Sequence, residues 1–174
     1  MKIVAIIQAR LDSKRLPNKV LLPICGIPII DLILKRLSLC KNLDNIIVAT
    51  SNNKKDLLLK KHVENLGFIC EQGSENNVLS RYYETASKYN ADVIVRITGD
   101  CPFVDPFLLD EYLKIFIEKK VDFLSNTNPP TFPDGLDISI FSKYALSEAH
   151  NNAETSFEKE HVVPYIYRNE KFNL

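Results

Sequence analysis

Residues 8–21, QARLDSKRLPNKVL, concentrate positive charge directly after an apolar segment, KIVAII. The stretch holds one acid, Asp12, and four cations, Arg10, Lys14, Arg15 and Lys19. Such a loop suits a triphosphate, because backbone N–H groups and basic side chains together offset several negative charges. It is neither a Walker A loop nor a dinucleotide-binding loop, since it lacks GxxxxGKS/T and holds no glycine. A solvated surface loop is the alternative, and composition alone leaves both open.

A second polar segment, RITGDCPFVDP at residues 96–106, also follows an apolar run. Asp100 comes directly after the expected strand, where a carboxylate needs a partner, and Gly99 before it relaxes the backbone. A hard cation such as Mg²⁺ takes oxygen ligands and stays in contact with substrate phosphates, so Asp100 is a candidate metal ligand. The alternative is that Asp100 caps a turn. For Asp105 the capping interpretation is favoured, because Pro106 follows it.

The three histidines divide by their surroundings. His62 lies on a Lys-rich helix and is expected to be exposed. His150 stands near a helix end, where it compensates the helix dipole. His161, in SFEKEHVVPYIY, has both charged and apolar neighbours, and a half-buried structural histidine is the favoured interpretation over a site residue.

Charge and cysteine content narrow the class of protein. The 174 residues carry 22 Lys and Arg against 22 Asp and Glu, which argues against a role in coating nucleic acid or anionic membrane. The four cysteines have no zinc-ligand spacing and indicate reduced thiols of a cytoplasmic protein. The N-terminal segment is read as a strand rather than a signal peptide, and no apolar run is long enough to span a membrane.

Short runs rich in β-branched residues alternate with helical patterns. The first helix is expected to have Pro28 in its first turn, the second Asn53 as cap and Gly67 as stop, and the third Asn76 or Asn77 as cap. This alternation predicts one α/β domain over 1–174, with a mostly parallel sheet covered by helices on both faces. Ligands of such sheets bind beyond the carboxyl ends of the strands, where both polar segments stand. Strands are expected at 2–7, 45–50, 67–71, 92–98, 121–125 and 136–141, a Pro-rich loop at 126–135, and helices at 28–42, 53–67, 76–90, 105–120, 143–151 and 157–168.

The segment IIQARLDSKRLPNKVLLPICGIPIIDLILKRL resembles the N-terminal signature of the sugar-acid cytidylyltransferases, most closely the SpsF-like spore-coat polysaccharide proteins. Three later segments resemble the same branch, in the same order: ADVIVRITGDCPFVDP, FPDGLDISIFS and EKEHVVPYIY. Together the four span nearly the whole chain. The residues that match the first pattern are Ala9, Arg10, Ser13, Lys14, Arg15, Leu16, Pro17 and Lys19.

The resemblance implies the three-layer α/β/α nucleotide-diphospho-sugar transferase fold and the reaction of CTP with a sugar or sugar acid to give a CMP-sugar and pyrophosphate. It implies Mg²⁺ as cofactor, held by Asp100, a role in polysaccharide or glycan biosynthesis, and often a homodimer. Arg10, Lys19 and Asp100 would be catalytic. The residues implied for CTP are Gln8, Ala9, Arg10, Ser13, Lys14, Arg15, Lys19, Arg81 and Gly99, and those implied for the acceptor are Asp134, Gly135, Asp137, Glu160 and His161.

Three positions depart from the pattern. Asp12 and Asn18 replace common glycines. The Asp12 carboxylate is expected either to point away from the triphosphate or to weaken its binding, and Asn18 to tolerate a positive φ. Ser139 stands where glutamate is common. The family continues to a segment with a second metal-binding aspartate, which this chain is expected to lack. A CTP-binding remnant without turnover and a glycosyltransferase-like nucleotide-sugar binder remain the alternatives.

Overall fold

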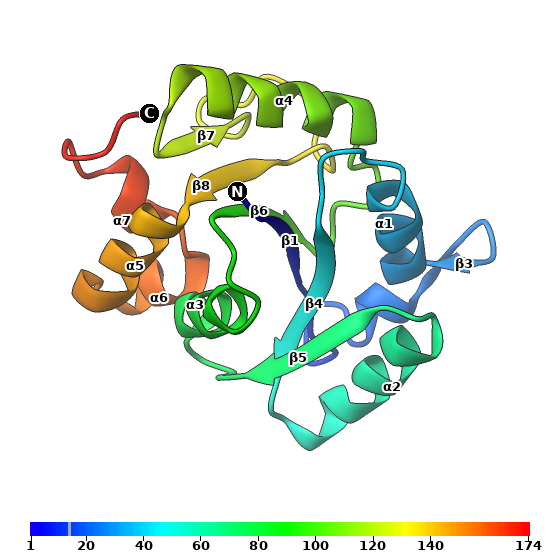
Figure 1. Ribbon diagram of the computed structural model, residues 1–174. Helices are drawn as coiled ribbons and strands as arrows, with labels where there is room; N and C mark the ends of the chain where they lie inside the picture. The colour runs from blue at the N-terminus through cyan, green and yellow to red at the C-terminus, as the bar shows by residue number, and fades with distance from the viewer. Residues whose placement is uncertain (14) are drawn as a thin grey trace.

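A six-stranded sheet forms the centre of the protein in our computed structural model, which describes residues 1–13 and 15–174 (Figure 1). The strand order is β5-β4-β1-β6-β8-β7. The strands β1, β4, β5 and β6 are parallel, and β8 is antiparallel to both of its neighbours, which confirms the predicted mostly parallel sheet. Their bounds are β1 Ile3–Gln8, β4 Asn45–Ser51, β5 Ile69–Gly73, β6 Val93–Thr98, β7 Phe123–Ser125 and β8 Ser139–Ser142.

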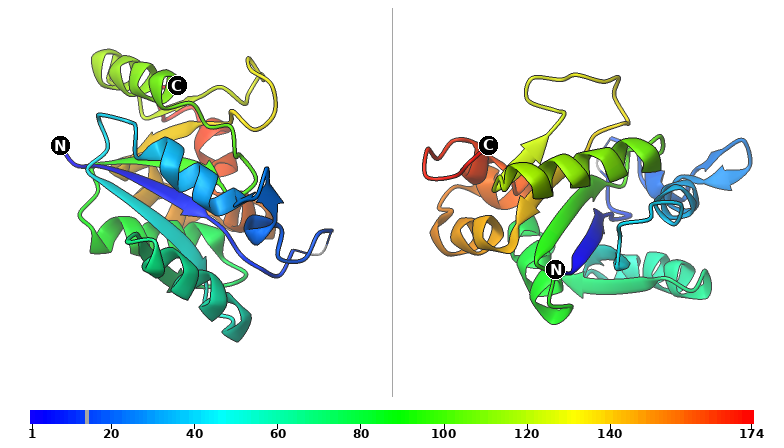
Figure 2. Two further views of the ribbon diagram at one scale, coloured as in Figure 1. Left: turned by 90° about the vertical axis from the view of Figure 1, so that its right-hand side faces the viewer. Right: turned by 45° about the horizontal axis from the view of Figure 1, so that its top comes forward.

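Helices cover both faces of the sheet and give three layers, as Figures 1 and 2 show. One face packs against α1 (Ile29–Leu37), α2 (Leu57–Asn65) and α4 (Pro106–Lys119). The other packs against α3 (Val78–Lys88), α5 (Lys143–Asn152) and α7 (Pro164–Tyr167), and α6 (Ser156–His161) packs against α3 and α7. The strand β1 is buried on both faces, which explains why its sequence is a continuous apolar run rather than an alternating one.

Helix ends follow the expected capping chemistry at three places. Asn77 caps α3, its side chain accepting a hydrogen bond of 2.9 Å from the Ser80 N–H. Asp105 caps α4 by accepting from two backbone N–H groups, so the capping interpretation is confirmed. Gly67 follows α2 with φ +83°, a conformation that suits glycine.

The hairpin of β2 (Pro23–Ile24) and β3 (Ile27–Pro28) was not predicted. Its two turn residues, Cys25 and Gly26, both have positive φ, as a two-residue type I′ turn requires. A Cys-Gly pair lacks the Asn-Gly or Asp-Gly signal of such turns, which is why the sequence pattern did not reveal it. Pro28 consequently ends the hairpin and precedes α1 instead of occupying its first turn.

Two further predictions on helices are wrong. Asn53 caps the short 3₁₀ helix η2 (Lys54–Asp56) rather than α2, accepting from the Lys55 N–H. His62 is not a freely exposed side chain, because its Nε2 lies 2.6 Å from Oδ1 of Asp31 on α1. His150, near the end of α5, stacks on Tyr83 with 4.0 Å between ring centroids.

The helix expected over 157–168 is divided into α6 and α7. Pro164 explains the division, because proline has no N–H and its ring clashes with the carbonyl four residues earlier in a helix. Val162 connects the two helices at φ 71°, ψ −58°, and the Val163 N–H donates to the His161 carbonyl at 2.8 Å. These values define a γ-turn of the rare, strained kind.

The four cysteines are free thiols, two of them buried and Cys25 exposed. None of the helices in the described ranges combines the length and the apolar character needed to cross a bilayer.

Candidate active site

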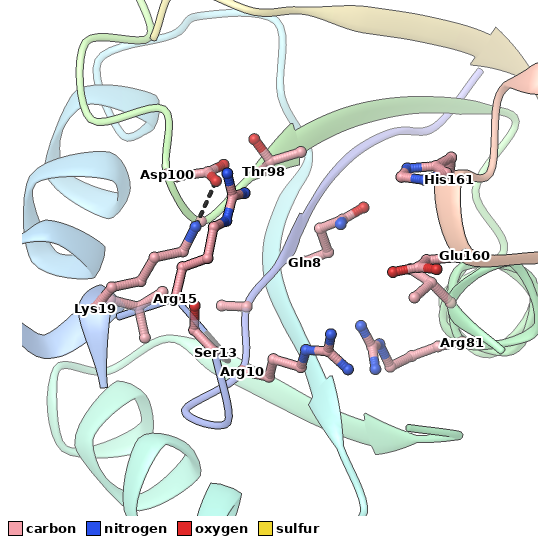
Figure 3. A pocket seen from close by; sticks show the side chains of 14 residues that line it. Gln8, Arg10, Ser13, Arg15, Lys19, Arg81, Thr98, Asp100, Glu160 and His161 are labelled. Atoms are coloured by element: carbon pink, nitrogen blue, oxygen red, sulfur yellow. Dashed lines mark hydrogen bonds and ion pairs between the residues drawn. The ribbon is translucent and has the colours of Figure 1, made fainter. Parts of the chain in front are cut away.

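A pocket of about 330 Å³ opens at the carboxyl ends of β1 and β6 (Figure 3). From β1 the chain proceeds through β4 to β5 on one side, and then returns to β6 on the other side of β1. The point between β1 and β6 is therefore the topological switch point of the sheet, where open α/β sheets bind their ligands. The pocket is lined by Gln8, Ala9, Arg10, Ser13, Arg15, Lys19, Val20, Val78, Arg81, Thr98, Gly99, Asp100, Glu160 and His161.

The start of the cationic loop is fixed by a buried carboxylate. Asp56, 1% exposed, accepts a hydrogen bond of 2.7 Å from the Leu11 N–H and further bonds from the N–H and hydroxyl of Ser51. Leu11 directly follows Arg10, so these bonds tie the phosphate-loop candidate to the end of β4. The role of Asp56 was not predicted, because nothing in the sequence near it indicates a partner 45 residues away.

Two arginines meet at one end of the pocket. Arg81, on α3, is only 3% exposed, and its Nη1 donates to the Ser74 carbonyl at 2.9 Å, whereas its Nε has no partner among the described residues. Figure 3 shows its guanidinium group facing that of Arg10. Burial lowers the pKa of Arg81, and the charge of Arg10 lowers it further. Two facing cations, one of them buried, favour an anion between them.

Lys19 and Asp100 form an ion pair at the other end, with 2.5 Å between Nζ and Oδ2. Lys19 begins the 3₁₀ helix η1 (Lys19–Leu21), and Asn18 before it has φ 59°, which confirms the expected positive φ. Burial alone would raise the pKa of Asp100, but hydrogen bonds from Lys19 and Thr98 outweigh it, so the pKa lies below its ordinary value. Asp100 is therefore ionised at neutral pH.

Gly99 is needed for space rather than for an unusual backbone conformation. A Cβ atom there would lie 3.0 Å from the Gln8 carbonyl oxygen and 3.1 Å from both Ala9 and Val20. The Gly99 N–H also donates to the Gln8 carbonyl at 2.9 Å. Gly99 was expected to relax the backbone. The structure shows instead that a glycine here allows β6 to approach β1 closely.

Three pocket residues were missed by sequence analysis: Val20, Val78 and Thr98. Thr98 is the last residue of β6, directly before Gly99, so its place in the motif was the available signal. Gln8 ends β1, and its buried Oε1 has no partner in the described structure. A buried acceptor without a donor is costly, which favours a ligand N–H group here.

Glu160 and His161, at the end of α6, line the opposite wall (Figure 3). Both are exposed, so the favoured half-buried structural interpretation of His161 is wrong. The γ-turn at Val162 follows directly and ends the helix at this wall.

Three expected acceptor residues, Asp134, Gly135 and Asp137, lie outside the pocket lining. Gly135 stands against the Phe103 ring, where an added Cβ would come within 3.1 Å. Burial raises the pKa of Asp137, and the charges of Asp134 and Asp100 raise it further, so a small acidic group adjoins the rim near Asp100.

Asp12 forms an ion pair of 3.1 Å with Lys55 and does not line the pocket, as expected for a carboxylate that points away from the triphosphate position. Lys14 lies outside the described residues.

Asp100 is the residue that fits a divalent cation best. The described part of the chain holds no group of three His, Cys, Asp or Glu side chains able to enclose a metal. Mg²⁺ does not need such an enclosure, since it is usually held by one or two carboxylates, substrate phosphates and water. An ionised, half-exposed carboxylate at the rim of a cationic pocket meets that description.

Fold and pocket thus define a nucleotide-binding α/β protein, and comparison with known proteins specifies the family. The profile described as Cytidylyltransferase matches residues 4–173. Protein MJ1063 of Methanocaldococcus jannaschii is 43% identical over 169 residues, covering 97% of this chain and 68% of that protein. The spore coat polysaccharide biosynthesis protein SpsF of Bacillus subtilis is 35% identical, covering 95% of this chain and 72% of SpsF.

Among solved structures, a cytidylyltransferase from Leptospira borgpetersenii superposes with a TM-score of 0.94 at 37% identity, covering 99% of this chain and 74% of that one. The chain belongs to the cytidylyltransferase family. The expected resemblance and the nucleotidyltransferase fold are both confirmed.

Proposed function

We propose that this chain transfers CMP from CTP to a hydroxyl of a sugar or sugar acid, with release of pyrophosphate, in surface polysaccharide or glycan biosynthesis. The observation that carries the proposal is the pocket at the switch point between β1 and β6, which is lined by the cations Arg10, Arg81 and Lys19. A cationic pocket of this size suits a nucleoside triphosphate. Family membership selects CTP. We place this activity in the cytosol, with a homodimer as the expected assembly.

Each side of the pocket has a role in this proposal. Arg10, Arg15 and Lys19 bind the triphosphate together with Ser13, and Lys14 of the same loop belongs to this set. The base lies against the end of β1, where Gln8 and Ala9 face it and the unpartnered Gln8 Oε1 accepts from the cytosine amino group. Arg81 completes the nucleotide side. Glu160 and His161 contact the acceptor, as do Asp134, Gly135 and Asp137 beyond the rim.

Asp100 would hold Mg²⁺, which when bound neutralises charge on the transferred and leaving phosphates. Lys19 forms an ion pair with the Asp100 carboxylate, so the phosphate-binding cation and the metal-binding carboxylate of this proposal are direct neighbours.

The transfer itself needs position and charge more than covalent chemistry. The acceptor oxygen attacks the α-phosphorus in line, a P–O bond forms, and the bond from that phosphorus to the bridging oxygen breaks. Pyrophosphate leaves with the electron pair. The hydroxyl proton passes to water at the open rim of the pocket.

A thermal-shift series with CTP, UTP, ATP and GTP, each with and without Mg²⁺, tests the nucleotide. Ligand at 100 times its Kd adds about 2.7 kcal/mol, which for a chain of this size raises Tm by roughly 5–10 °C. Of the four nucleotides, only CTP should raise Tm by this amount, and the rise should be larger when Mg²⁺ is present. A shift by none of the nucleotides would overturn the proposal.

Pyrophosphate release with CTP and a panel of sugars and sugar acids tests the transfer. CTP binding without release would indicate a binding protein. Binding of a ready-made nucleotide sugar without binding of CTP would indicate a glycosyltransferase-like protein instead.

A further inference from the structure

Asp12 is an acid inside the cationic loop that is proposed to receive the triphosphate. It stands between the pocket residues Arg10 and Ser13 in the chain, where consecutive Cα atoms are only about 3.8 Å apart. Its side chain is half-exposed and does not line the pocket. A carboxylate this near a triphosphate repels it, so the direction of the Asp12 side chain affects the affinity for the nucleotide.

The backbone next to Asp12 is held by three hydrogen bonds. Leu11 before it donates its N–H to the buried carboxylate of Asp56 at 2.7 Å. The Leu11 carbonyl accepts hydrogen bonds of 2.9 Å from the N–H groups of Ser13 and Asn18. The start of the loop and its return are therefore joined at Leu11, which fixes the point from which the Asp12 side chain extends.

Lys55 on η2 holds the Asp12 carboxylate, with 3.1 Å between Nζ and Oδ1. Asn53 fixes the backbone of η2, because its side chain accepts from the Lys55 N–H at 3.1 Å and its carbonyl accepts from the Asp56 N–H at 3.0 Å. Lys55 and Asp56 are consecutive, and so are their partners in the loop. The ion pair is therefore one half of a two-point contact between η2 and the loop, and not an isolated surface pair.

The effect of this ion pair falls on an anionic ligand more than on the fold. An exposed ion pair adds little to stability, because water and salt screen it. A triphosphate in the pocket, however, meets the charge of Asp12 at close range. Lys55 offsets that charge and keeps the carboxylate at η2, away from the cations and N–H groups that bind phosphate.

We propose that Lys55 is a positioning residue for triphosphate binding: it holds Asp12 outside the pocket and neutralises it, and so raises the affinity of the loop for phosphate groups. This inference rests on the proposed function, because it concerns the nucleotide side of the same pocket. Lys55 itself is assigned no contact with the nucleotide or with the acceptor.

The experiment measures the Kd for CTP and, separately, for inorganic tripolyphosphate by titration calorimetry, at about 20 mM and about 500 mM salt. The proteins are the unaltered chain, Lys55→Met, Lys55→Arg, Asp12→Gly and the double variant of Lys55→Met with Asp12→Gly. Lys54→Met is the matched control, because it removes the same charge from the neighbouring position of η2. Lys54 is exposed and belongs to none of the ion pairs found in residues 1–13 and 15–174.

We expect Lys55→Met to weaken the binding of both anions by about three- to tenfold at the low salt concentration, and by less than about twofold at the high one, because the repulsion by Asp12 is screened. Lys55→Arg and Lys54→Met should bind within about twofold of the unaltered chain. In the Asp12→Gly background, Lys55→Met should have no effect, since the charge that it leaves unpaired is gone. With an acceptor present, Lys55→Met should raise KM for CTP and leave kcat and Tm unchanged.

The inference is overturned if Lys55→Met binds both anions as tightly as Lys54→Met does. A loss of affinity that persists in the Asp12→Gly background also overturns it, because Lys55 would then attract the nucleotide directly, and so does failure of the unaltered chain to bind either anion. Binding of tripolyphosphate that depends on Lys55, without binding of CTP or without release of pyrophosphate from it, would instead refute the proposed function and leave the inference standing.

Discussion

Replacing Asp56 by alanine should weaken both the fold and the binding of CTP. This carboxylate is buried and accepts from the backbone N–H groups of Leu11 and Ser51, the former at 2.7 Å. Alanine leaves both N–H groups buried without an acceptor, while the Ser51 hydroxyl can turn to another partner. The pocket residue Arg10 adjoins Leu11, so the loop loses the bond that places its first cation.

The size of the effect follows from these contacts. Hydrogen bonds to a charged group contribute about 1.5–3 kcal/mol each, so two of them amount to about 3–6 kcal/mol of unfolding free energy. At roughly 2–4 °C per kcal/mol for a chain of this length, Tm should fall by at least 6 °C. CTP affinity should fall at least tenfold, the equivalent of one displaced phosphate contact.

Urea unfolding and calorimetric titration with CTP measure the two effects. Asp56→Asn, which keeps one acceptor oxygen, provides a milder variant if the alanine protein does not fold. Asp44→Ala is the matched control, because Asp44 accepts from the Ile3 N–H at 2.7 Å at the opposite end of β1. A CTP affinity that falls equally in the Asp44 and Asp56 variants, or a stability loss below about 1 kcal/mol, would refute the reasoning.

Three further results are expected. Lys19→Ala and Asp100→Ala should each reduce the rate of pyrophosphate release by about 10²–10³ with Tm nearly unchanged, and near-normal rates in steady-state assays would contradict their roles. Asn18→Val should lower the unfolding free energy by about 1–2 kcal/mol, because a β-branched residue disfavours φ 59°, whereas Asn18→Gly should be neutral; equal urea midpoints for the two would contradict this. Burial alone would raise the pKa of Asp110, but hydrogen bonds from Cys40, Lys41 and Asn42 outweigh it and hold the pKa low. Its folded pKa therefore lies below the unfolded one, and the stability it contributes at neutral pH is lost as the pH falls through the folded value. Tm measured from pH 7 to pH 3 should fall more steeply in the unaltered protein than in Asp110→Asn, and parallel curves would contradict the assignment.

The sheet was predictable because its parallel strands are buried on both faces and read as apolar runs. Asp105 and Asn77 mark helix starts through side-chain caps that need only neighbouring residues. The β2–β3 hairpin was not predicted, because Cys25 adopts a positive φ that is unusual for its residue type. The division of the last helix at Val162 depends on a turn whose conformation is held by burial rather than by local preference.

The position of the site was predictable where the ends of the parallel strands determine which residues meet. Two polar segments at the ends of parallel strands had to meet at one edge, which brought Lys19 to Asp100. Arg81 and His161 were expected through family resemblance alone, because no spacing argument connects α3 or α6 to β1. Asp56 was missed, since its importance comes from a partner, Leu11, that it gains only in the folded structure.

The γ-turn at Val162 stores backbone strain directly behind one wall of the pocket. A valine at φ 71° costs on the order of 1–3 kcal/mol, which is released whenever α6 separates from α3 and α7 and the turn relaxes. Its fully buried side chain holds the turn in place only while the surrounding core is packed. The strain at Val162 therefore lowers the free energy needed to move the wall that carries Glu160 and His161 while β1 and β6 stay folded.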